Sequence, residues 1–297
     1  MGVWEVIPML PNVMEGQQMY GTKLCMSVSE SYGLPAKKQI SMLKEVGFEG
    51  FFTTWEKGDD IRAYREEADR CGMFYQSLHA PFANSANMWK PYEEAKPAVE
   101  ELLECLSVCK ENDIPIMVCH AYIGFDNSLP TEQGVQNFKI VTDAAKELGV
   151  RIAFENTEGE AYLDKLMEAF LENENVGFCW DTGHELCYNR GKDMLEKYGK
   201  RLFCTHLNDN LGIRNYAGEI TWLDDLHILP FDGIANWKNI VKRLNKYDYK
   251  DVLTFELNIN SKPGRHENDA YAKMDLRCYF TECYKRACRV AALKNSY

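Results

Sequence analysis

The amino-acid sequence predicts a single α/β domain, a (β/α)8 TIM barrel, and three observations support this prediction. Short apolar runs alternate with helical patterns along the chain, as expected of a parallel sheet that is buried on both faces. Eight such units fit into the 297 residues, and barrels of this kind take about 250 residues as one domain. Most of the apolar runs end in His, Asp or Glu, and these barrels carry their active sites at the carboxyl ends of the strands.

The expected strands and helices follow one another in alternation. We expect the strands at residues 23–28, 50–55, 74–79, 114–120, 150–155, 176–181, 202–206 and 252–256. We expect the helices at residues 35–46, 60–71, 91–111, 131–148, 161–171, 192–198, 235–244 and 270–293. Pro35 suits the first turn of its helix, and Gly47, Gly72 and Gly149 mark the ends of three helices. The longest loop, residues 210–234, is expected at the active face, because long loops in compact domains are usually functional.

The chain divides into an N-terminal arm and one catalytic domain. Residues 1–22 show no clean periodicity and are expected to pack on the barrel or on a partner subunit, whereas residues 23–297 form the barrel. The start has no basic region and is interrupted by Pro8 and Pro11, so we do not expect a signal peptide. No apolar run approaches the length of a membrane span, so no membrane partner is expected.

Two features of the composition limit the partners and the compartment. The net charge of −11 argues against a nucleic-acid partner, because the phosphates would be repelled. The eleven cysteines form no C-x-x-C pair and fall mainly within apolar strands and helices. Free, mostly buried thiols in a reducing compartment follow from this pattern, and we expect a cytoplasmic protein.

Four strand ends predict a metal site. Glu155, Asp181, His206 and Glu256 end four successive strands and would meet at one rim of the barrel. Mixed carboxylate and imidazole ligands suit Mn²⁺, Zn²⁺, Co²⁺ or Fe²⁺, with open positions for two substrate oxygens. A lone histidine is more often a core or loop residue, but clustered carboxylates at a barrel mouth are costly without a cation.

A set of short motifs carries a resemblance to a known group of proteins. The motifs are Ser77-Leu-His79-Ala-Pro81, Cys119-His120, Phe154-Glu155-Asn156, Trp180-Asp-Thr-Gly-His184, His206-Leu-Asn-Asp209, Asp225-Leu-His227 and Phe255-Glu256. Together they resemble the xylose isomerase-like TIM-barrel superfamily. That superfamily contains sugar and sugar-phosphate isomerases and epimerases, and also the endonuclease IV class of apurinic-site nucleases.

The resemblance to the ketose 3-epimerases implies a metal on Glu155, Asp181, His206 and Glu256, with His184 touching a substrate oxygen. The metal would be Mn, Zn or Co, and the substrate a small sugar or sugar phosphate. Glu155 and Glu256 would lie on opposite sides of the sugar, where one takes a proton to form an enediolate that the cation stabilises. The other glutamate would return a proton from the opposite face, or the same base would return it to the neighbouring carbon. The family's habits and the N-terminal arm suggest a homo-oligomer.

The resemblance to the nucleases keeps a second reading open, with up to three zinc ions. His79 and His120 would join bridging Glu155 in one zinc site, and His184, Asp225 and His227 would form another. The net charge of −11 and the lack of basic loops that could grip phosphates argue against this reading. A sugar lyase and a barrel without activity are further alternatives.

Secondary candidates for substrate binding come from three kinds of residue. Asn156 follows the glutamate of the fifth strand, and Arg214 in the long loop could bind a phosphate or hydroxyl group. Aromatic residues could form an apolar wall under a sugar ring, although they could equally be packing residues. They are Trp55, Phe82, Trp89, Trp180 and Trp222.

Overall fold

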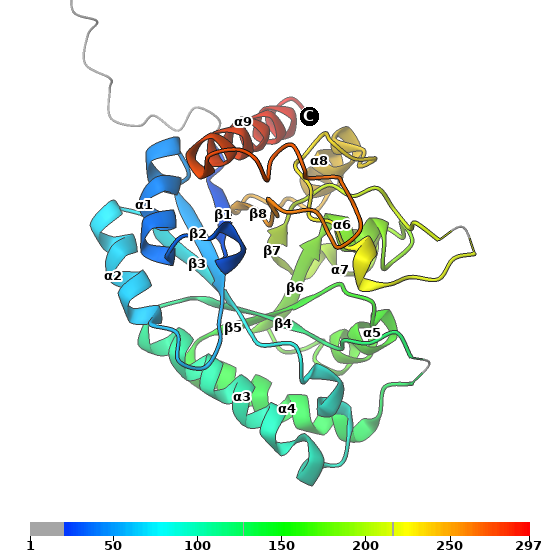
Figure 1. The fold of residues 1–297 in the computed structure, drawn as a ribbon. Coiled ribbons are helices and arrows are strands. Elements are labelled where there is room, and N and C mark those ends of the chain that lie inside the picture. Colours follow the sequence, from blue (N-terminus) through cyan, green and yellow to red (C-terminus); the bar gives the residue numbers. More distant parts are fainter. Residues whose placement is uncertain (1–20, 127, 216) are drawn as a thin grey trace, which may run out of the picture.

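Eight parallel strands form a nearly closed barrel in the computed structural model, which describes residues 21–126, 128–215 and 217–297 (Figure 1). The strands are β1 (Leu24–Val28), β2 (Gly50–Thr54), β3 (Phe74–His79), β4 (Ile116–His120), β5 (Arg151–Glu155), β6 (Val176–Asp181), β7 (Leu202–His206) and β8 (Leu253–Phe255). They are hydrogen-bonded in the order β7-β6-β5-β4-β3-β2-β1-β8. A parallel bridge between Leu207 and Phe255 joins the two outer strands, and the Leu207 amide donates to the Thr254 carbonyl at 2.8 Å. The predicted (β/α)8 barrel is therefore confirmed.

Helices lie around the outside of the barrel (Figure 1). The α-helices are α1 (Ala36–Val46), α2 (Ile61–Cys71), α3 (Tyr92–Glu111), α4 (Glu132–Leu148), α5 (Glu160–Ala169), α6 (Thr182–Leu186), α7 (Met194–Tyr198), α8 (Trp237–Lys246) and α9 (Leu276–Asn295). Short 3-10 helices are η1 (Glu30–Tyr32), η2 (Ser85–Trp89), η3 (Gly199–Arg201) and η4 (Trp222–Asp224). Among the described residues, none of the helices combines the length and the apolar character that crossing a membrane would require.

Capping residues explain where several helices begin and end. Gly72 and Gly149 follow α2 and α4 with φ angles of 63° and 71°, in the left-handed region that favours glycine, as the sequence predicted. The last helix was expected from residue 270 but begins at Leu276, because the Asp275 side chain accepts a hydrogen bond from the Arg277 amide at 2.9 Å. The expected N-terminal arm lies outside the described residues for positions 1–20.

The alternation of side chains along each strand decides which residues face the barrel interior. Successive side chains of a strand point to opposite faces. Phe154 therefore faces outward, where its ring packs 5.5 Å from the ring of Phe138 on α4. One small cluster of buried residues includes four that lie two positions before the candidate ligands at the ends of β4, β5, β6 and β7. They are Val118, Ala153, Cys179 and Cys204. These side chains fill the barrel interior next to the candidate ligands, which lie at the carboxyl ends of their strands.

The cysteines are free, as expected. All eleven lack a disulfide, and only Cys278 is exposed. Cys179 and Cys204 are partners in the register of β6 and β7 and belong to the interior cluster. Their small size, rather than a reactive role, fits the space inside the barrel.

Candidate metal centre and active site

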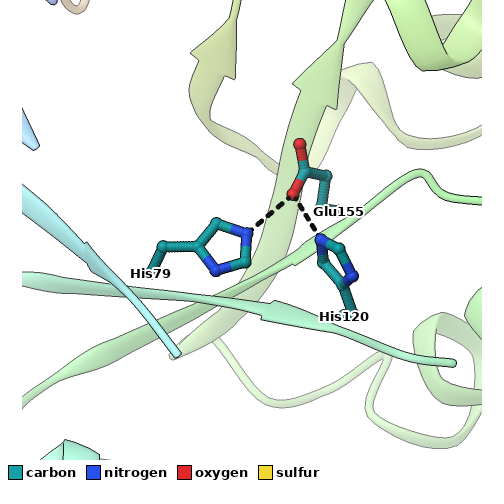
Figure 2. Close-up of side chains that lie close together, drawn as sticks. All are labelled: His79, His120 and Glu155. Carbon is teal, nitrogen blue, oxygen red and sulfur yellow. Dashed lines mark hydrogen bonds and ion pairs between the residues drawn. The ribbon is translucent and has the colours of Figure 1, made fainter. Parts of the chain in front are cut away.

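Glu155, at the end of β5, is the hub of the candidate site. Its Oε2 atom lies 3.2 Å from Nε2 of His79 and 3.1 Å from Nε2 of His120 (Figure 2). Its Oε1 atom lies 2.8 Å from Nδ1 of His206. The Glu155 side chain is 1% exposed, so this carboxylate is enclosed by histidines that three other strands supply.

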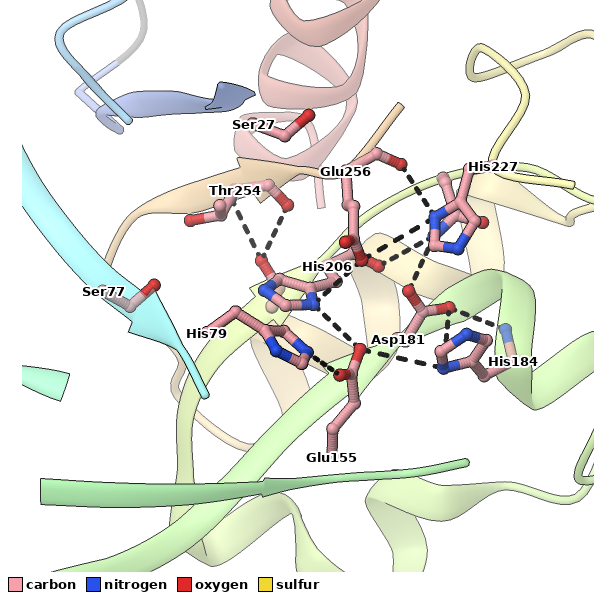
Figure 3. A network of polar contacts seen from close by, with 12 residues as sticks. Ser27, Ser77, His79, Glu155, Asp181, His184, His206, His227, Thr254 and Glu256 are labelled. Carbon is pink, nitrogen blue, oxygen red and sulfur yellow. Dashed lines mark hydrogen bonds and ion pairs between the residues drawn. The ribbon is translucent and has the colours of Figure 1, made fainter. Parts of the chain in front are cut away.

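Glu256 approaches the same nitrogen of His206 that Glu155 contacts (Figure 3). It follows β8 directly, and its Oε2 atom lies 3.1 Å from Nδ1 of His206. Ligand atoms of Glu155, Asp181, His206 and Glu256 all lie within 4.8 Å of one another. The four residues expected to share a metal are thus brought together from the ends of β5 to β8.

Asp181 is held in place by the short helix α6. Asp181 ends β6 and caps α6, and its Oδ1 atom accepts a hydrogen bond from the His184 amide at 2.6 Å. The Asn208 amide donates to Oδ2 of Asp181 at 2.8 Å. A Cβ atom at Gly183 would lie 1.9 Å from Oδ1 of Asn208, so position 183 requires glycine in this packing.

A second group of ligands continues the first. Oδ1 of Asp225 lies 3.3 Å from Nε2 of His184 and 2.8 Å from Nε2 of His227. Nδ1 of His227 in turn lies 3.7 Å from Oε2 of Glu256. All the histidines and carboxylates expected to bind metal or substrate therefore form one connected network. Figure 3 shows the part of it around Glu155, His206 and Glu256.

Burial and mutual attraction shift the pKa values of the cluster strongly. Burial raises the pKa of a carboxyl group, but the nearby histidines outweigh this effect and hold the pKa of Glu155 well below its usual range and that of Glu256 at about 2. Burial lowers the pKa of a histidine, but the carboxylates outweigh it at His206, whose pKa is raised well above 6.5, and at His227, whose pKa rises to about 9. Burial dominates at two members of the cluster, where it raises the pKa of Asp181 to about 6 and lowers the pKa of His120 below its usual value. Near neutral pH, protons on the imidazoles therefore hold the carboxylates together where a cation would otherwise do so.

These residues fit a divalent metal. Oδ1 of Asp225 is buried and has no aligned hydrogen-bond partner among the described residues, although Nε2 of His227 is only 2.8 Å away. Two atoms that bind the same metal ion lie close together without a hydrogen bond between them, because both direct a lone pair at the ion. Mixed oxygen and nitrogen donors are the set that Mn²⁺, Zn²⁺ and Co²⁺ accept.

The secondary candidates lie in different surroundings. Asn156 is fully buried, and its side-chain amide binds the Asp181 backbone and the side chain of Asn189. Trp55 is 3% exposed and packs in the main hydrophobic core. Arg214 is exposed, and its backbone amide donates to Asp224 at 3.0 Å.

The other aromatic candidates divide in the same way. Trp89 and Trp180 are buried, and their indole groups donate to Ala121 and Glu185. Phe82 is 38% exposed, and its ring stacks 4.8 Å from the His120 ring. Phe82 therefore gives the histidine side of the site an apolar surface.

The chain is similar to a known protein family and to individual proteins. A family model described as xylose isomerase-like TIM barrel matches residues 40–280. An uncharacterized protein, y4fM, of Sinorhizobium fredii is 30% identical over 176 residues, which cover 55% of this chain and 53% of that protein. An inosose dehydratase of Histophilus somni is 28% identical over 138 residues, which cover 41% of this chain and 45% of that protein. The chain thus spans about half the length of the curated relatives it matches.

Several solved structures share the fold over most of their length. The IOLI protein with a bound zinc atom has a TM-score of 0.70 at 18% identity, covering 91% of this chain and 98% of that one. L-ribulose 3-epimerase has a TM-score of 0.67 at 13% identity, covering 93% and 96%. D-psicose 3-epimerase in the presence of D-fructose has a TM-score of 0.63 at 16% identity, covering 90% and 97%. At these identities the likeness establishes the fold alone.

Proposed function

The chain belongs to the xylose isomerase-like TIM-barrel family, and on that premise we propose that it is a divalent-metal-dependent isomerase or epimerase of a small sugar or sugar derivative. The observation that carries the proposal is the placement of two glutamates about His206. Glu155 and Glu256 lie 2.8 Å and 3.1 Å from the same atom, Nδ1 of His206 (Figure 3). Two carboxylates that face one space can remove a proton from a substrate and return one.

The metal would be held by Glu155, Asp181, His206 and Glu256, whose ligand atoms lie within 4.8 Å of one another. A divalent ion there would polarise the carbonyl group of the substrate and so make the neighbouring C–H bond more acidic. The neighbouring structures named as 3-epimerases and the zinc atom in the IOLI structure support this assignment.

The two glutamates would carry the protons. Both are charged near neutral pH, because neighbouring histidines outweigh the effect of burial and lower their pKa values, so either can act as a base. Removal of a proton by one glutamate and return by the other, from the opposite face, would invert a carbon centre. Return by the same glutamate to the neighbouring carbon would instead interconvert an aldose and a ketose.

His184 would orient the substrate. Its Nδ1 atom lies 2.9 Å from the Asn156 carbonyl, and its Nε2 atom faces Asp225 at 3.3 Å. Burial disfavours the charged ring, but Asp181 and Asp225 outweigh it and raise the pKa of His184 well above its usual value. A ring protonated at Nε2 can donate a hydrogen bond to a substrate oxygen.

Solvent-exchange measurements test the proposal. The protein, loaded with Mn²⁺, Co²⁺ or Zn²⁺, is incubated in D₂O with free ketoses and aldoses, and deuterium incorporation beside the carbonyl carbon is followed by NMR. Glu155→Gln and Glu256→Gln should each lower turnover by about 10²- to 10⁴-fold, the usual contribution of an acid–base group. Glu100→Gln, an exposed residue of α3, is the matched control and should keep full turnover. Substantial exchange by Glu155→Gln would remove this residue from the mechanism.

A phosphodiesterase is a second candidate, because one observation favours it. His79 and His120 share one oxygen of Glu155, and Asp225 lies between His184 and His227, which is an arrangement suited to several zinc ions. Nicking of apurinic DNA by protein that holds three zinc ions would establish this reading. Its absence from protein that turns over a sugar would exclude it.

A lyase is a third candidate, supported by the relative named inosose dehydratase. Dehydration also begins with removal of a proton beside a carbonyl group, but then a hydroxyl group leaves. Mass spectrometry distinguishes the two outcomes, since an isomerase keeps the mass of its substrate and a dehydratase product is lighter by one water.

A further inference from the structure

The carboxylate cluster opens on a cavity that reaches beyond the metal ligands. This cavity has a volume of about 210 Å³, and Asp225, His227 and Glu256 form part of its wall. It shares the lining residues Ser29 and Thr54 with a larger cavity of about 800 Å³ that lies over the ends of β1 and β2. The two cavities are therefore neighbours at the ends of β1 and β2.

The wall of the small cavity is rich in neutral hydrogen-bonding groups. Besides the metal ligands, its polar lining consists of Ser27, Ser29, Ser31, Thr54, Asn258 and Lys262. Among the described residues that line this cavity, Lys262 is the sole Lys or Arg. Hydroxyl and amide groups can each donate and accept, which matches the hydroxyl groups of a polyol.

The structure holds Lys262 in place at the edge of the site. Its Nζ atom lies 3.6 Å from Oδ2 of Asp225 and 5.5 Å from the centre of the Trp222 ring. Its backbone amide donates to Oε1 of Glu267 at 2.9 Å, and its side chain is only 17% exposed. An ammonium group in this position can bind an oxygen of a molecule seated beside Glu256.

Arg265 connects the segment that carries Lys262 to the long loop through its guanidinium group. Its guanidinium donates to the Leu223 carbonyl at 3.1 Å and lies 3.5 Å from Asp224 and 3.7 Å from Glu267. These contacts join the segment after β8 to the long loop that contains η4. The Arg265 side chain is 10% exposed, and its charge is already balanced by the carboxylates of Asp224 and Glu267.

The larger cavity is acidic, which would also repel a phosphate. Its charged lining residues are Glu30, Lys37, Glu56, Asp59 and Asp60, so one cation faces four carboxylates. A phosphate monoester carries nearly two negative charges and is normally bound by several cationic or amide donors. Neither cavity supplies such a set among the described residues.

We infer that the substrate is an uncharged polyhydroxylated carbonyl compound rather than a sugar phosphate, and that Lys262 is a specificity-determining residue that binds one of its oxygens. The inference rests on the proposed function and narrows its substrate class. Loss of a hydrogen bond from a charged donor should raise KM by about 10- to 100-fold and leave kcat largely unchanged, because the reacting atoms are held by other residues.

Matched substrate pairs test this inference. Metal-loaded protein is assayed in D₂O with D-fructose, D-psicose, L-ribulose and an inosose, and with the monophosphate of each. Lys262→Met is compared with Lys273→Met, which removes an exposed lysine of the same segment, and with the conservative Lys262→Arg. Free compounds should exceed their monophosphates at least tenfold in kcat/KM. Lys262→Met should raise KM, Lys262→Arg should restore part of the loss, and Lys273→Met should behave as the parent protein.

Each other outcome has a distinct meaning. A monophosphate that is preferred over its free counterpart would overturn the inference and leave the proposed function standing. Preference for free compounds with an unchanged KM in Lys262→Met would overturn the role of Lys262. The absence of exchange with every member of the panel, together with no loss of water, would refute the proposed function itself and the inference with it.

Discussion

Asn208 offers the sharpest test of how the protein positions its proposed metal ligands. The Asn208 amide is fully buried and donates to Oδ2 of Asp181 at 2.8 Å. Asn208→Ala would remove this donor and leave the Asp181 carboxylate with one fewer partner. Asp181 already has a pKa raised to about 6 by burial, so losing a hydrogen bond to its charged form should raise that pKa further.

The expected magnitude follows from the kind of bond that is lost. A hydrogen bond to a charged group contributes about 1.5–3 kcal/mol, which corresponds to roughly 10- to 150-fold in a dissociation constant. Residues that orient metal ligands typically affect metal affinity by about 10- to 100-fold. We therefore expect Asn208→Ala to weaken Mn²⁺ or Zn²⁺ binding by about 10- to 100-fold.

Metal titration against a chromophoric chelator at fixed pH measures this change. Asn137→Ala is the matched control, because Asn137 is also buried but its amide donates to the carbonyls of Met88 and Lys90 at 2.7 Å and 2.9 Å. Both variants should unfold at lower temperature, and only Asn208→Ala should lose metal affinity. Equal metal affinity in Asn208→Ala and the parent protein would refute the positioning role.

Further predictions concern pH, a glycine and the thiols. A metal competes with protons on His206 and Asp181, because the pKa values of both groups are raised. The dissociation constant of the metal should therefore increase as pH falls from 8 to 5, by about tenfold per pH unit for each displaced proton. Titrations that give the same dissociation constant across this range would contradict the prediction. Gly183→Ala would place Cβ 1.9 Å from Oδ1 of Asn208, so thermal unfolding should show a large loss of stability, and an unchanged midpoint would disprove the close packing. Iodoacetamide should label Cys278 first in the native protein and all eleven thiols after denaturation, and a lower final count by mass spectrometry would reveal a disulfide.

The barrel and its ligands could be predicted because their signals are local in the sequence. Each of β3 to β7 is an apolar run that ends in His, Asp or Glu, and parallel strands bring these ends to one rim. Side-chain alternation then places Glu155 inward and Phe154 outward without further information. The same logic predicted Glu256, although β8 itself ends one residue earlier, at Phe255.

The remaining features depend on contacts between distant segments. Asn156 follows Glu155 directly, but its hydrogen bonds to the backbone of Asp181 on the neighbouring strand could not be predicted from its place in the sequence. Lys262 lies in a segment without periodicity. It lies beside the site because Arg265, three residues later, binds the loop around η4. The sequence of residues 256–275 contains no pattern that would predict this contact. Asn208 belongs to the motif that begins at His206, so the sequence drew attention to it. Its hydrogen bond to Asp181 could not be predicted, because it depends on where the two strands place these residues.

Metal content measured together with sugar turnover tests the central claim most directly. The purified protein is analysed for divalent metals per chain, then assayed for ketose exchange before chelation, after chelation and after metal is restored. We expect one equivalent of Mn, Co or Zn at the cluster of Glu155, Asp181, His206 and Glu256, with turnover that is lost on chelation and regained with metal. Full turnover by the metal-free protein would contradict the account, and so would three zinc ions with cleavage of apurinic DNA and no action on any sugar.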